Sequence, residues 1–327
     1  MTIYDIAREA GVSASSVSRV VNHKPGVNPQ TRKLIEGLLE KYNFIPSETA
    51  RGLVNQSSKM LGILVADIRN VHYTDGAYFV EREFARLGYC CIIFNTGSDP
   101  AAKAEYIRIL GKRQVEGAVL VGSTFQTKEV EEAIVQYLPD CPIIMANGYL
   151  DLPNVYGVLA DEKEGVYNLA RLLFTKGHDR LAFINDQYTP SNRMKIEGFR
   201  KALEENGQEE ILIYDTDGTL EDAGQVTKQL IKEHPDINGI VYSVDLIAVG
   251  GGRALMDLDK KVPQEIAYVG VDNSIYAQIS TPKLTSLDNK LLEISSVAAR
   301  ILKDVLEGRQ TTKKVLVFSS IVERETT

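Results

Sequence analysis

The chain has 327 residues and a formal net charge of −7, and this length favours two or three domains over one compact core. The charge is uneven: residues 1–59 carry eight Lys or Arg and five Asp or Glu, whereas the remainder carries 29 and 39. An acidic balance excludes nucleic-acid binding over the whole surface. A mildly basic head on an acidic body predicts that contact with nucleic acid is confined to the N-terminal end.

Several functional classes lack their usual signals. No apolar run is long enough to span a membrane, and we find no export signal, so we expect a cytoplasmic protein with its three cysteines reduced. The four histidines are scattered without the spacing of metal ligands, and no hydrolase, zinc-protease or Cys-x-x-Cys motif occurs. We therefore expect no enzyme, no metal site and no cofactor.

The first 22 residues predict two short helices joined by a turn at Gly11. Residues 2–10 form an amphipathic run that Thr2 can cap. Residues 12–22 have one narrow apolar stripe and an opposite face of small polar residues with Arg19. This is the order of a helix-turn-helix motif, whose second helix fits the DNA major groove. On spacing alone, a small surface helix packed on its neighbour is the alternative.

The next segment predicts a third helix and a short fourth one. Asn28-Pro29 is a helix start, and the apolar spacing continues to about Tyr42. Residues 43–46 break the helix. Residues 47–54 begin with a good capping serine but are too few to hold a helix alone in water.

From residue 60 onward, short apolar strands alternate with amphipathic helices. The expected strands are Met60–Ala66, Cys90–Asn95, Gly117–Val121, Pro142–Ala146, Leu181–Asn185, Ile211–Tyr214, Gly239–Tyr242 and Ile266–Val271. This alternation predicts parallel sheets with helices on both faces. So many units over about 270 residues favour two doubly wound lobes, in which ligands bind beyond the carboxyl ends of the strands.

The triplet Gly250-Gly251-Gly252 is a poor helix former inside a predicted helix. A phosphate-binding loop is disfavoured because neither the P-loop lysine nor a Gly-x-Gly-x-x-Gly pattern accompanies it. We interpret the triplet as a site of close helix packing.

The stretches TIYDIAREAGVSASSVSRVVN and VNPQTRKLIEGLLEKYNFIPSETARGL resemble the DNA-binding headpiece of the lac-repressor (LacI/GalR) family of bacterial transcription regulators. The dense match covers residues 2–53. The resemblance implies a helix-turn-helix headpiece over 1–46, a hinge helix and linker over 47–59, and an effector-binding and dimerisation domain over 60–327. This α/β domain is expected to be two-lobed and periplasmic-binding-protein-like, with crossovers near Asp161, Asp288 and Phe318.

The family pattern also implies which residues contact DNA. Ala14 and Ser15 match the pair that reads operator bases, and Leu53 matches a leucine that enters the minor groove from the hinge. The residues expected at the DNA are Thr2, Tyr4, Ser13, Ala14, Ser15, Ser18, Arg19, Asn22, Thr31, Arg32, Ala50 and Leu53.

An effector pocket between the lobes is expected on the same basis, built from loops that follow the strands. Arg193, in SNRMKIEGF, matches an arginine that holds sugar hydroxyls or anionic groups, and Asp272, in VGVDN, matches an effector-binding aspartate. We expect these two as the polar anchors. The expected effector-binding residues are His72, Tyr73, Ser123, Asn147, Arg193, Asp245 and Asp272.

The resemblance thus implies a homodimeric, sequence-specific repressor of carbohydrate-utilisation genes that binds a pseudo-palindromic operator. A small effector, either a sugar or a sugar phosphate, would control it. The alternative within the family is catabolite-control regulation, in which a phosphorylated carrier protein (a phosphocarrier) stabilises DNA binding. Outside this class the alternative is a solute-binding protein, against which the missing export signal and the headpiece both count.

Overall fold

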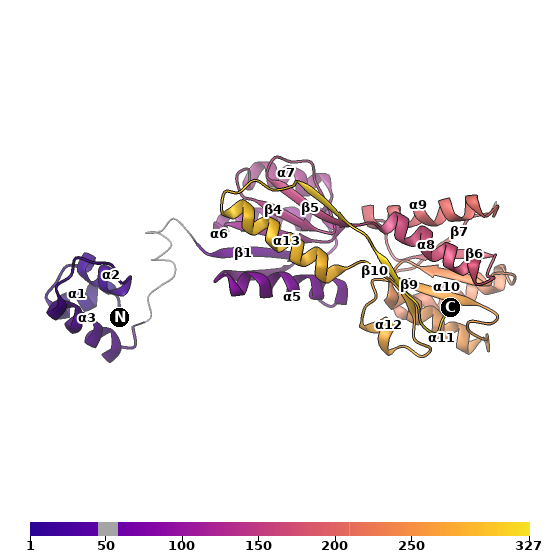
Figure 1. Cartoon of the computed structure of the whole chain (residues 1–327), viewed down its shortest axis with the longest axis horizontal. Helices are drawn as coiled ribbons and strands as arrows, with labels where there is room; N and C mark the ends of the chain where they lie inside the picture. The colour runs from indigo at the N-terminus through magenta and orange to yellow at the C-terminus, as the bar shows by residue number, and fades with distance from the viewer. Residues whose placement is uncertain (45–57, 209) are drawn as a thin grey trace. The chain divides into compact units, whose positions relative to one another are not determined.

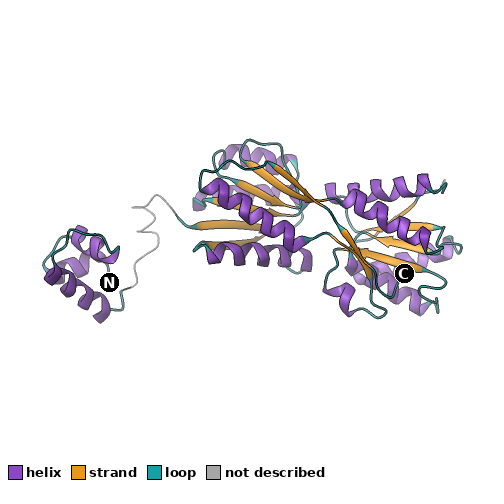
Figure 2. Ribbon diagram, viewed as in Figure 1, coloured by secondary structure: helices purple, strands orange, loops and turns teal. Residues whose placement is uncertain are grey.

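The computed structural model describes residues 1–44, 58–208 and 210–327 (Figures 1 and 2). The chain divides into two compact units, Met1–Ser58 and Lys59–Thr327. The predicted hinge helix at 47–54, with Ala50 and Leu53, lies outside the described residues. Within the described ranges, no helix is long and apolar enough to cross a membrane.

The N-terminal unit is a three-helix domain, as the sequence predicts, formed by α1 (Ile3–Ala10), α2 (Ala14–Val21) and α3 (Pro29–Lys41). A side-chain cap starts each of the three helices: Thr2 forms a capping box with Asp5, and Ser13 and Asn28 accept backbone N–H groups at the starts of α2 and α3. The capping serine predicted for residues 47–54 lies outside the described residues. The apolar stripes meet in a small core whose most buried members are Ile6, Val17, Val20 and Ile35.

The second unit contains two six-stranded sheets. The first has the strand order β11-β5-β4-β3-β1-β2, and all its pairings are parallel. Its strands are β1 (Met60–Val65), β2 (Cys90–Asn95), β3 (Gly117–Val121), β4 (Ile143–Ala146), β5 (Val155–Ala160) and β11 (Lys314–Val317).

The second sheet has the order β12-β10-β9-β8-β6-β7, and its pairings are parallel except for the antiparallel edge pair of β10 and β12. Its strands are β6 (Leu181–Asn185), β7 (Leu212–Asp215), β8 (Gly239–Tyr242), β9 (Ala267–Val271), β10 (Thr285–Asp288) and β12 (Ser320–Val322).

Helices cover both faces of each sheet, so the central strands are buried on both sides (Figure 2). One face of the first sheet is covered by α5 (Val71–Arg86) and α13 (Leu291–Leu306), and the other face by α6 (Pro100–Arg113) and α7 (Lys128–Tyr137). One face of the second sheet is covered by α8 (Glu162–Thr175) and α9 (Pro190–Glu205), and the other face by α10 (Leu220–Glu233) and α11 (Asp245–Asp257). The turn η1 (Ser123–Phe125) and the short α12 (Ile275–Ile279) complete the unit.

The chain passes between the two lobes three times (Figure 1). It leaves the first sheet after Ala160 at the end of β5, returns after Asp288 at the end of β10, and crosses again between Val317 and Ser320. These three crossover segments run side by side between the lobes, and they border the cleft described below.

The sequence analysis does not predict four of the strands, which are β5, β10, β11 and β12. β10 reads Thr-Ser-Leu-Asp, which has one strongly apolar residue, and β12 has three residues. β10 and β12 form because neighbouring strands supply the hydrogen-bond partners, which a local apolar pattern does not show. β5 and β11 do carry apolar residues, and the sequence expectation missed them. The long apolar runs behave as predicted, and β2, β3, β6 and β8 begin and end at the expected residues.

The glycine triplet in α11 confirms the packing interpretation. A Cβ on Gly251 would lie 1.9 Å from the hydroxyl oxygen of Tyr242, and one on Gly250 would lie 2.3 Å from the carbonyl oxygen of Leu220. Tyr242 is fully buried and its hydroxyl is 2.9 Å from that of Thr227. The triplet therefore lets α11 approach the sheet and α10 closely.

We predict that Gly251→Ala lowers the free energy of unfolding by about 1–3 kcal/mol, because Tyr242 has no space to retreat. The matched control is Gly224→Ala in α10, where the nearest atom would lie 3.4 Å away. That change should be neutral or stabilise by up to about 1 kcal/mol, since alanine favours helices. Urea unfolding of both variants tests this, and equal stabilities would contradict the packing interpretation.

Candidate DNA interface and interlobe cleft

The exposed side of α2 carries the residues expected to read DNA. Val17, Val20 and Val21 face the core, whereas Ser15 and Arg19 are exposed and Ala14, Ser18 and Asn22 are half-buried. Tyr4 is 73% exposed, although Ile6 on the same helix is fully buried. Exposing an aromatic ring to water is unfavourable, so the position of Tyr4 favours contact with a partner surface over a role in packing.

Other predicted DNA residues also hold the headpiece together. The hydroxyl of Ser13 accepts the N–H of Ser16 and lies 2.7 Å from the hydroxyl of Ser15. Asn22 Nδ2 donates to the carbonyl of Ser18 at 2.8 Å. Arg32, half-buried beside Thr31, donates to the carbonyl of Lys24 at 2.8 Å. Ser13, Asn22 and Arg32 therefore order the backbone as well as present polar groups to solvent.

A small polar cleft, partly open to solvent, lies between the lobes of the second unit. Its lining comes from the segments that follow β1, β3, β4, β5, β6, β8 and β9, together with the start of α9. This is the carboxyl edge of both sheets, where doubly wound folds bind ligands. Five predicted effector residues line it: His72, Tyr73, Ser123, Asn147 and Asp272.

The other two predicted residues lie elsewhere. Arg193 is exposed and lies outside the cleft lining, and the cation that faces the cleft is Lys195, two residues later on α9. Asp245 is buried behind the lining residue Val244. The phase of α9 explains the difference, because Asn192, Lys195 and Phe199 share its buried face. The helical spacing of that segment was a signal that could have identified Lys195.

Lys195 forms the centre of the cleft's electrostatics. Its ammonium donates to the carbonyl of Ser243 at 2.9 Å and lies 3.7 Å from Glu162 Oε1, and both side chains of this ion pair are almost fully buried. Burial by itself lowers the pKa of Lys195, but Glu162 and then Asp272 and Asp186 outweigh burial, so the net shift is upward. Lys195 is therefore a permanent cation at neutral pH.

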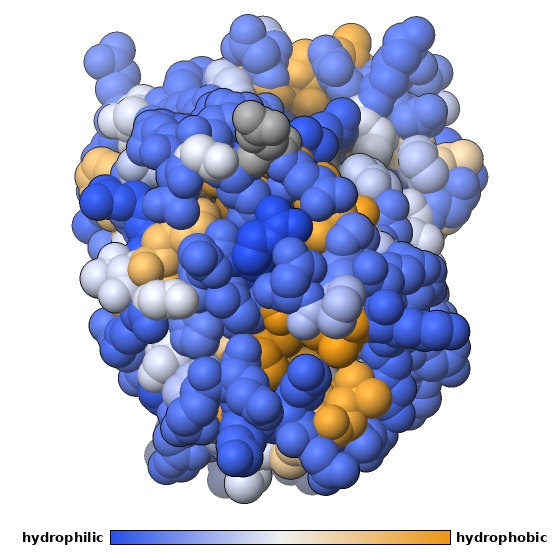
Figure 3. Space-filling model, turned by 90° about the vertical axis from the view of Figure 1, so that its right-hand side faces the viewer, coloured by the Kyte–Doolittle hydropathy of each residue, from blue (hydrophilic) through white to orange (hydrophobic). Residues whose placement is uncertain are grey.

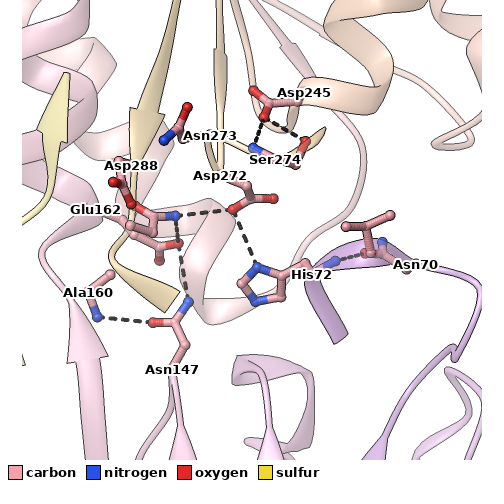
Figure 4. A network of polar contacts seen from close by, with 12 residues as sticks. Asn70, His72, Asn147, Ala160, Glu162, Asp245, Asp272, Asn273, Ser274 and Asp288 are labelled. Atoms are coloured by element: carbon pink, nitrogen blue, oxygen red, sulfur yellow. Dashed lines mark hydrogen bonds and ion pairs between the residues drawn. The ribbon is translucent and has the colours of Figure 1, made fainter. Parts of the chain in front are cut away.

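Polar contacts join the two lobes across the cleft (Figure 4). His72 Nδ1 lies 3.5 Å from Asp272 Oδ1, and Asn147 Nδ2 donates to Glu162 at 3.4 Å. At the rim, the backbone N–H of Ser191 donates to the hydroxyl of Ser123 at 3.1 Å. Because these contacts are few and polar, a ligand with hydroxyl groups can add to or replace them as the lobes close.

Asp272 is held in an unusual backbone conformation. Its φ is +104° and that of Asn273 is +49°, both in the region that favours glycine. Holding a non-glycine residue in this conformation costs of order 1–3 kcal/mol, and such residues concentrate at functional sites. Asp272 accepts a hydrogen bond from Asn289 Nδ2 at 3.2 Å, which helps to fix its carboxylate at the cleft.

Asp245 is buried next to this network. Its carboxylate accepts the N–H and hydroxyl of Ser274 at 2.7 and 2.8 Å (Figure 4). It also accepts the hydroxyl of Ser286 at 2.5 Å. Burial, with the nearby charge of Asp272, nevertheless raises the pKa of Asp245 to about 7. Asp245 therefore supports the loop that carries Asp272 instead of facing a ligand.

The remaining lining sets the chemistry that the cleft can recognise. Tyr73 packs edge-on against His72 at 5.6 Å between ring centroids, and burial raises its pKa to about 12, so its hydroxyl stays neutral. Carboxylates from Glu162, Asp186 and Asp272 accompany the one lysine in this lining. Such a lining offers donors and acceptors for hydroxyl groups and disfavours a strongly anionic ligand. Among the described residues, no group of His, Cys, Asp and Glu could hold a metal ion.

Two family models match the chain. Residues 2–47 match that of the bacterial regulatory proteins of the lacI family, and residues 170–327 match that of the periplasmic binding protein-like domain. A helix-turn-helix transcriptional regulator of Lachnoclostridium phytofermentans is 28% identical over all of this chain and 99% of its own. The ribose operon repressor of Halalkalibacterium halodurans is 29% identical over all of this chain and 97% of its own. Catabolite control protein A of Priestia megaterium is 28% identical over 99% and 96%.

Solved structures share the fold. The lac repressor dimer bound to operator and an anti-inducer superposes with a TM-score of 0.88 at 22% identity, covering 100% of this chain and 98% of that one. A complex of the regulator CelR with cellobiose gives 0.74 at 21% identity and full coverage of both chains. A ribose-bound regulator of Enterococcus faecium gives 0.73 at 22% identity over 82% of this chain and 98% of that one.

A helix-turn-helix headpiece joined to a periplasmic-binding-protein-like body defines the class of a DNA-binding transcriptional regulator. The headpiece of this chain, residues 2–47, matches the lacI family of bacterial regulatory proteins. The chain is a sequence-specific DNA-binding transcriptional regulator, as are the relatives to which it is similar, and those relatives are regulators instead of enzymes.

We predict that the raised pKa of Asp245 makes the second unit less stable as pH rises from 5 to 7. In this range the folded protein retains a proton that the unfolded chain has lost, so the free energy of unfolding falls by up to about 1.4 kcal/mol per pH unit. Asp245→Asn should remove this decline, because the amide does not ionise.

The matched control is Asp257→Asn, which changes an exposed aspartate paired with Lys228 and should leave the wild-type pH dependence intact. Urea unfolding at three pH values measures all three proteins. Parallel curves for wild type and Asp245→Asn would show that Asp245 is not the group responsible.

Proposed function

We propose that the protein is a homodimeric repressor of carbohydrate-utilisation genes that acts in the cytoplasm and binds a pseudo-palindromic operator. Each subunit would place α2 in the major groove of one half-site, and a neutral polyhydroxylated effector in the interlobe cleft would change operator affinity. The observation that carries this proposal is that one chain has both an exposed α2 face without acidic residues and a polar cleft in its second unit.

The surface of α2 suits direct readout of DNA. Its exposed side has no acidic residue, so no carboxylate would repel the phosphates. Arg19 offers the planar donor fork that recognises guanine or phosphate, and Ala14 and Ser15 are short enough to bring the helix close to the bases. Tyr4, Thr31 and Arg32 are proposed to contact the phosphate backbone and set the register.

The cleft suits a sugar. Lys195 supplies a buried cation, and Asp272, Asn147 and Asp186 supply acceptors and donors around it. Similar solved structures hold cellobiose or ribose, which supports a saccharide for this cleft. We propose Lys195, in place of Arg193, as the cationic anchor, with Asp272 as its acidic counterpart.

Pairing of two copies is supported by exposed apolar side chains on both lobes. Tyr78 on α5 is 50% exposed, and Ile279 on α12 is 68% exposed. Strand β2 is a free sheet edge with Ile93 41% exposed. The end of the second lobe shown in Figure 3 is instead mainly hydrophilic, with small, separated apolar areas. We therefore place the dimer contact along α5, β2 and α12.

We predict that Arg19→Ala weakens binding to the preferred operator by about 10- to 100-fold and relaxes the preference at one base pair of each half-site, as expected for a lost bidentate contact. The operator is first recovered by selection from random duplexes with the wild-type protein. Fluorescence anisotropy with this operator and its single-base variants measures the effect.

Arg8→Ala is the matched control, since Arg8 is an exposed arginine on α1 whose side chain is 82% accessible. It removes the same charge and should change affinity little and uniformly. If Arg8→Ala and Arg19→Ala lower affinity equally for all sequences, α2 does not read the operator through Arg19.

We predict that Lys195→Met abolishes stabilisation by a bound sugar, whereas Arg193→Met preserves it. A ligand at one hundred times its Kd stabilises the protein by about 2.7 kcal/mol, which thermal unfolding detects readily. D-Ribose, cellobiose and their phosphorylated forms are the probes, and the neutral sugars should act where the phosphates do not.

Lys195→Arg, which keeps the cation, guards against a variant that simply fails to fold, and it should retain part of the stabilisation. Loss of the sugar effect in Arg193→Met with retention in Lys195→Met would reverse our assignment. Stabilisation by a phosphorylated carrier protein, and by none of the sugars, would favour catabolite-control regulation instead.

A further inference from the structure

The side chain of Asn289 connects all three crossover segments. Asn289 follows β10 in the second crossover and is 2% exposed. Its amide nitrogen donates to Glu162 Oε1 at 3.3 Å, and Glu162 directly follows the first crossover. Its amide oxygen accepts the hydroxyl of Ser319, in the third crossover, at 3.2 Å. One buried amide therefore holds together the segments about which the lobes would move.

The same amide also touches the cleft. Its nitrogen donates to Asp272 Oδ1 at 3.2 Å, so its two hydrogens serve two carboxylates that line the cleft. Hydrogen bonds to charged acceptors are stronger than neutral ones, and in a buried site they are costly to leave unmade. Asn289 itself lies outside the lining, directly behind Glu162 and Asp272.

The crossover backbone fixes the direction in which Asn289 points. Asp288 accepts the N–H of Lys290 at 2.7 Å and its ammonium at 2.9 Å. Lys290 has a φ of +57°, in the left-handed region, so the chain bends sharply next to Asn289. Because the backbone is fixed on both sides, the amide cannot follow Glu162 or Asp272 if either one moves.

We propose that Asn289 is a positioning residue that holds the lobes in their closed arrangement by bonding the three crossovers to the two cleft carboxylates. Glu162 and Asp272 in turn make the contacts that bridge the lobes, to Asn147 and His72. A ligand hydroxyl that binds either carboxylate competes for the same oxygen atoms as Asn289. Ligand binding and lobe orientation are thereby coupled through one side chain. This coupling rests on the proposed effector role of the cleft, whereas the closure itself does not.

Hydrogen–deuterium exchange at the Ser191 amide measures closure without any ligand. This N–H donates across the rim of the cleft to Ser123, so it is protected only while the lobes are together. The Val130 amide is a matched reference, since it donates to the hydroxyl of Thr127 within the first lobe. In the full-length protein, Asn289→Ala should speed exchange at Ser191 at least tenfold and leave Val130 unchanged.

Two further variants separate coupling from general destabilisation. Asn289→Asp keeps the size and the acceptor for Ser319 but turns a carboxylate toward Glu162 and Asp272, so exchange at Ser191 should be at least as fast as in Asn289→Ala. Asn154→Ala removes an amide that donates twice, to Leu138 and Cys141, within the first lobe, and it should leave Ser191 protected.

Wild-type protection at Ser191 in Asn289→Asp would overturn the proposal, as would equal loss of protection in Asn154→Ala. Because no ligand takes part, either result would leave the proposed sugar binding intact, and a failure to bind sugars would leave this test unaffected.

Discussion

The buried ion pair of Lys195 and Glu162 is the interaction on which the arrangement of the second unit depends. Two opposite charges in a nearly dry environment are stable only if their remaining bonding capacity is satisfied, and here Ser243, Asn147 and Asn289 satisfy it. These partners come from both lobes and from a crossover. A requirement for charge compensation thus determines where the lobes meet, and it leaves polar groups facing the cleft.

This constraint explains why the site is polar although both lobes have well-packed apolar cores. Burial in the sheets stabilises each lobe separately, with Phe183, Phe199 and Tyr242 among the fully buried residues. The space between the lobes has few apolar contacts, so their relative orientation depends on hydrogen bonds and charge. Weak, specific contacts of this kind let a small ligand bias one orientation by a few kcal/mol.

The sequence predicts elements better than it predicts side-chain environments. Long apolar runs identify β3 and β6 because strand burial leaves a local signature. Thr2 and Asn28 mark helix starts because their side chains accept backbone N–H groups of the first turn. The family resemblance points to Arg193 as the cleft cation, but the buried face of α9 presents Lys195 instead. Asn289 had no sequence signal, since its partners are up to 127 residues away and only the tertiary fold brings them together.

We propose that the cleft and the operator share one free energy of coupling. Thermodynamic linkage requires the factor by which a sugar changes operator affinity to equal the factor by which operator changes sugar affinity. The decisive measurement is a paired titration of the wild-type protein, with the selected operator titrated at zero and saturating sugar and the sugar titrated with and without operator. We expect the same factor from both, about 5- to 150-fold. A sugar that binds in the cleft and leaves operator affinity unchanged would contradict the account.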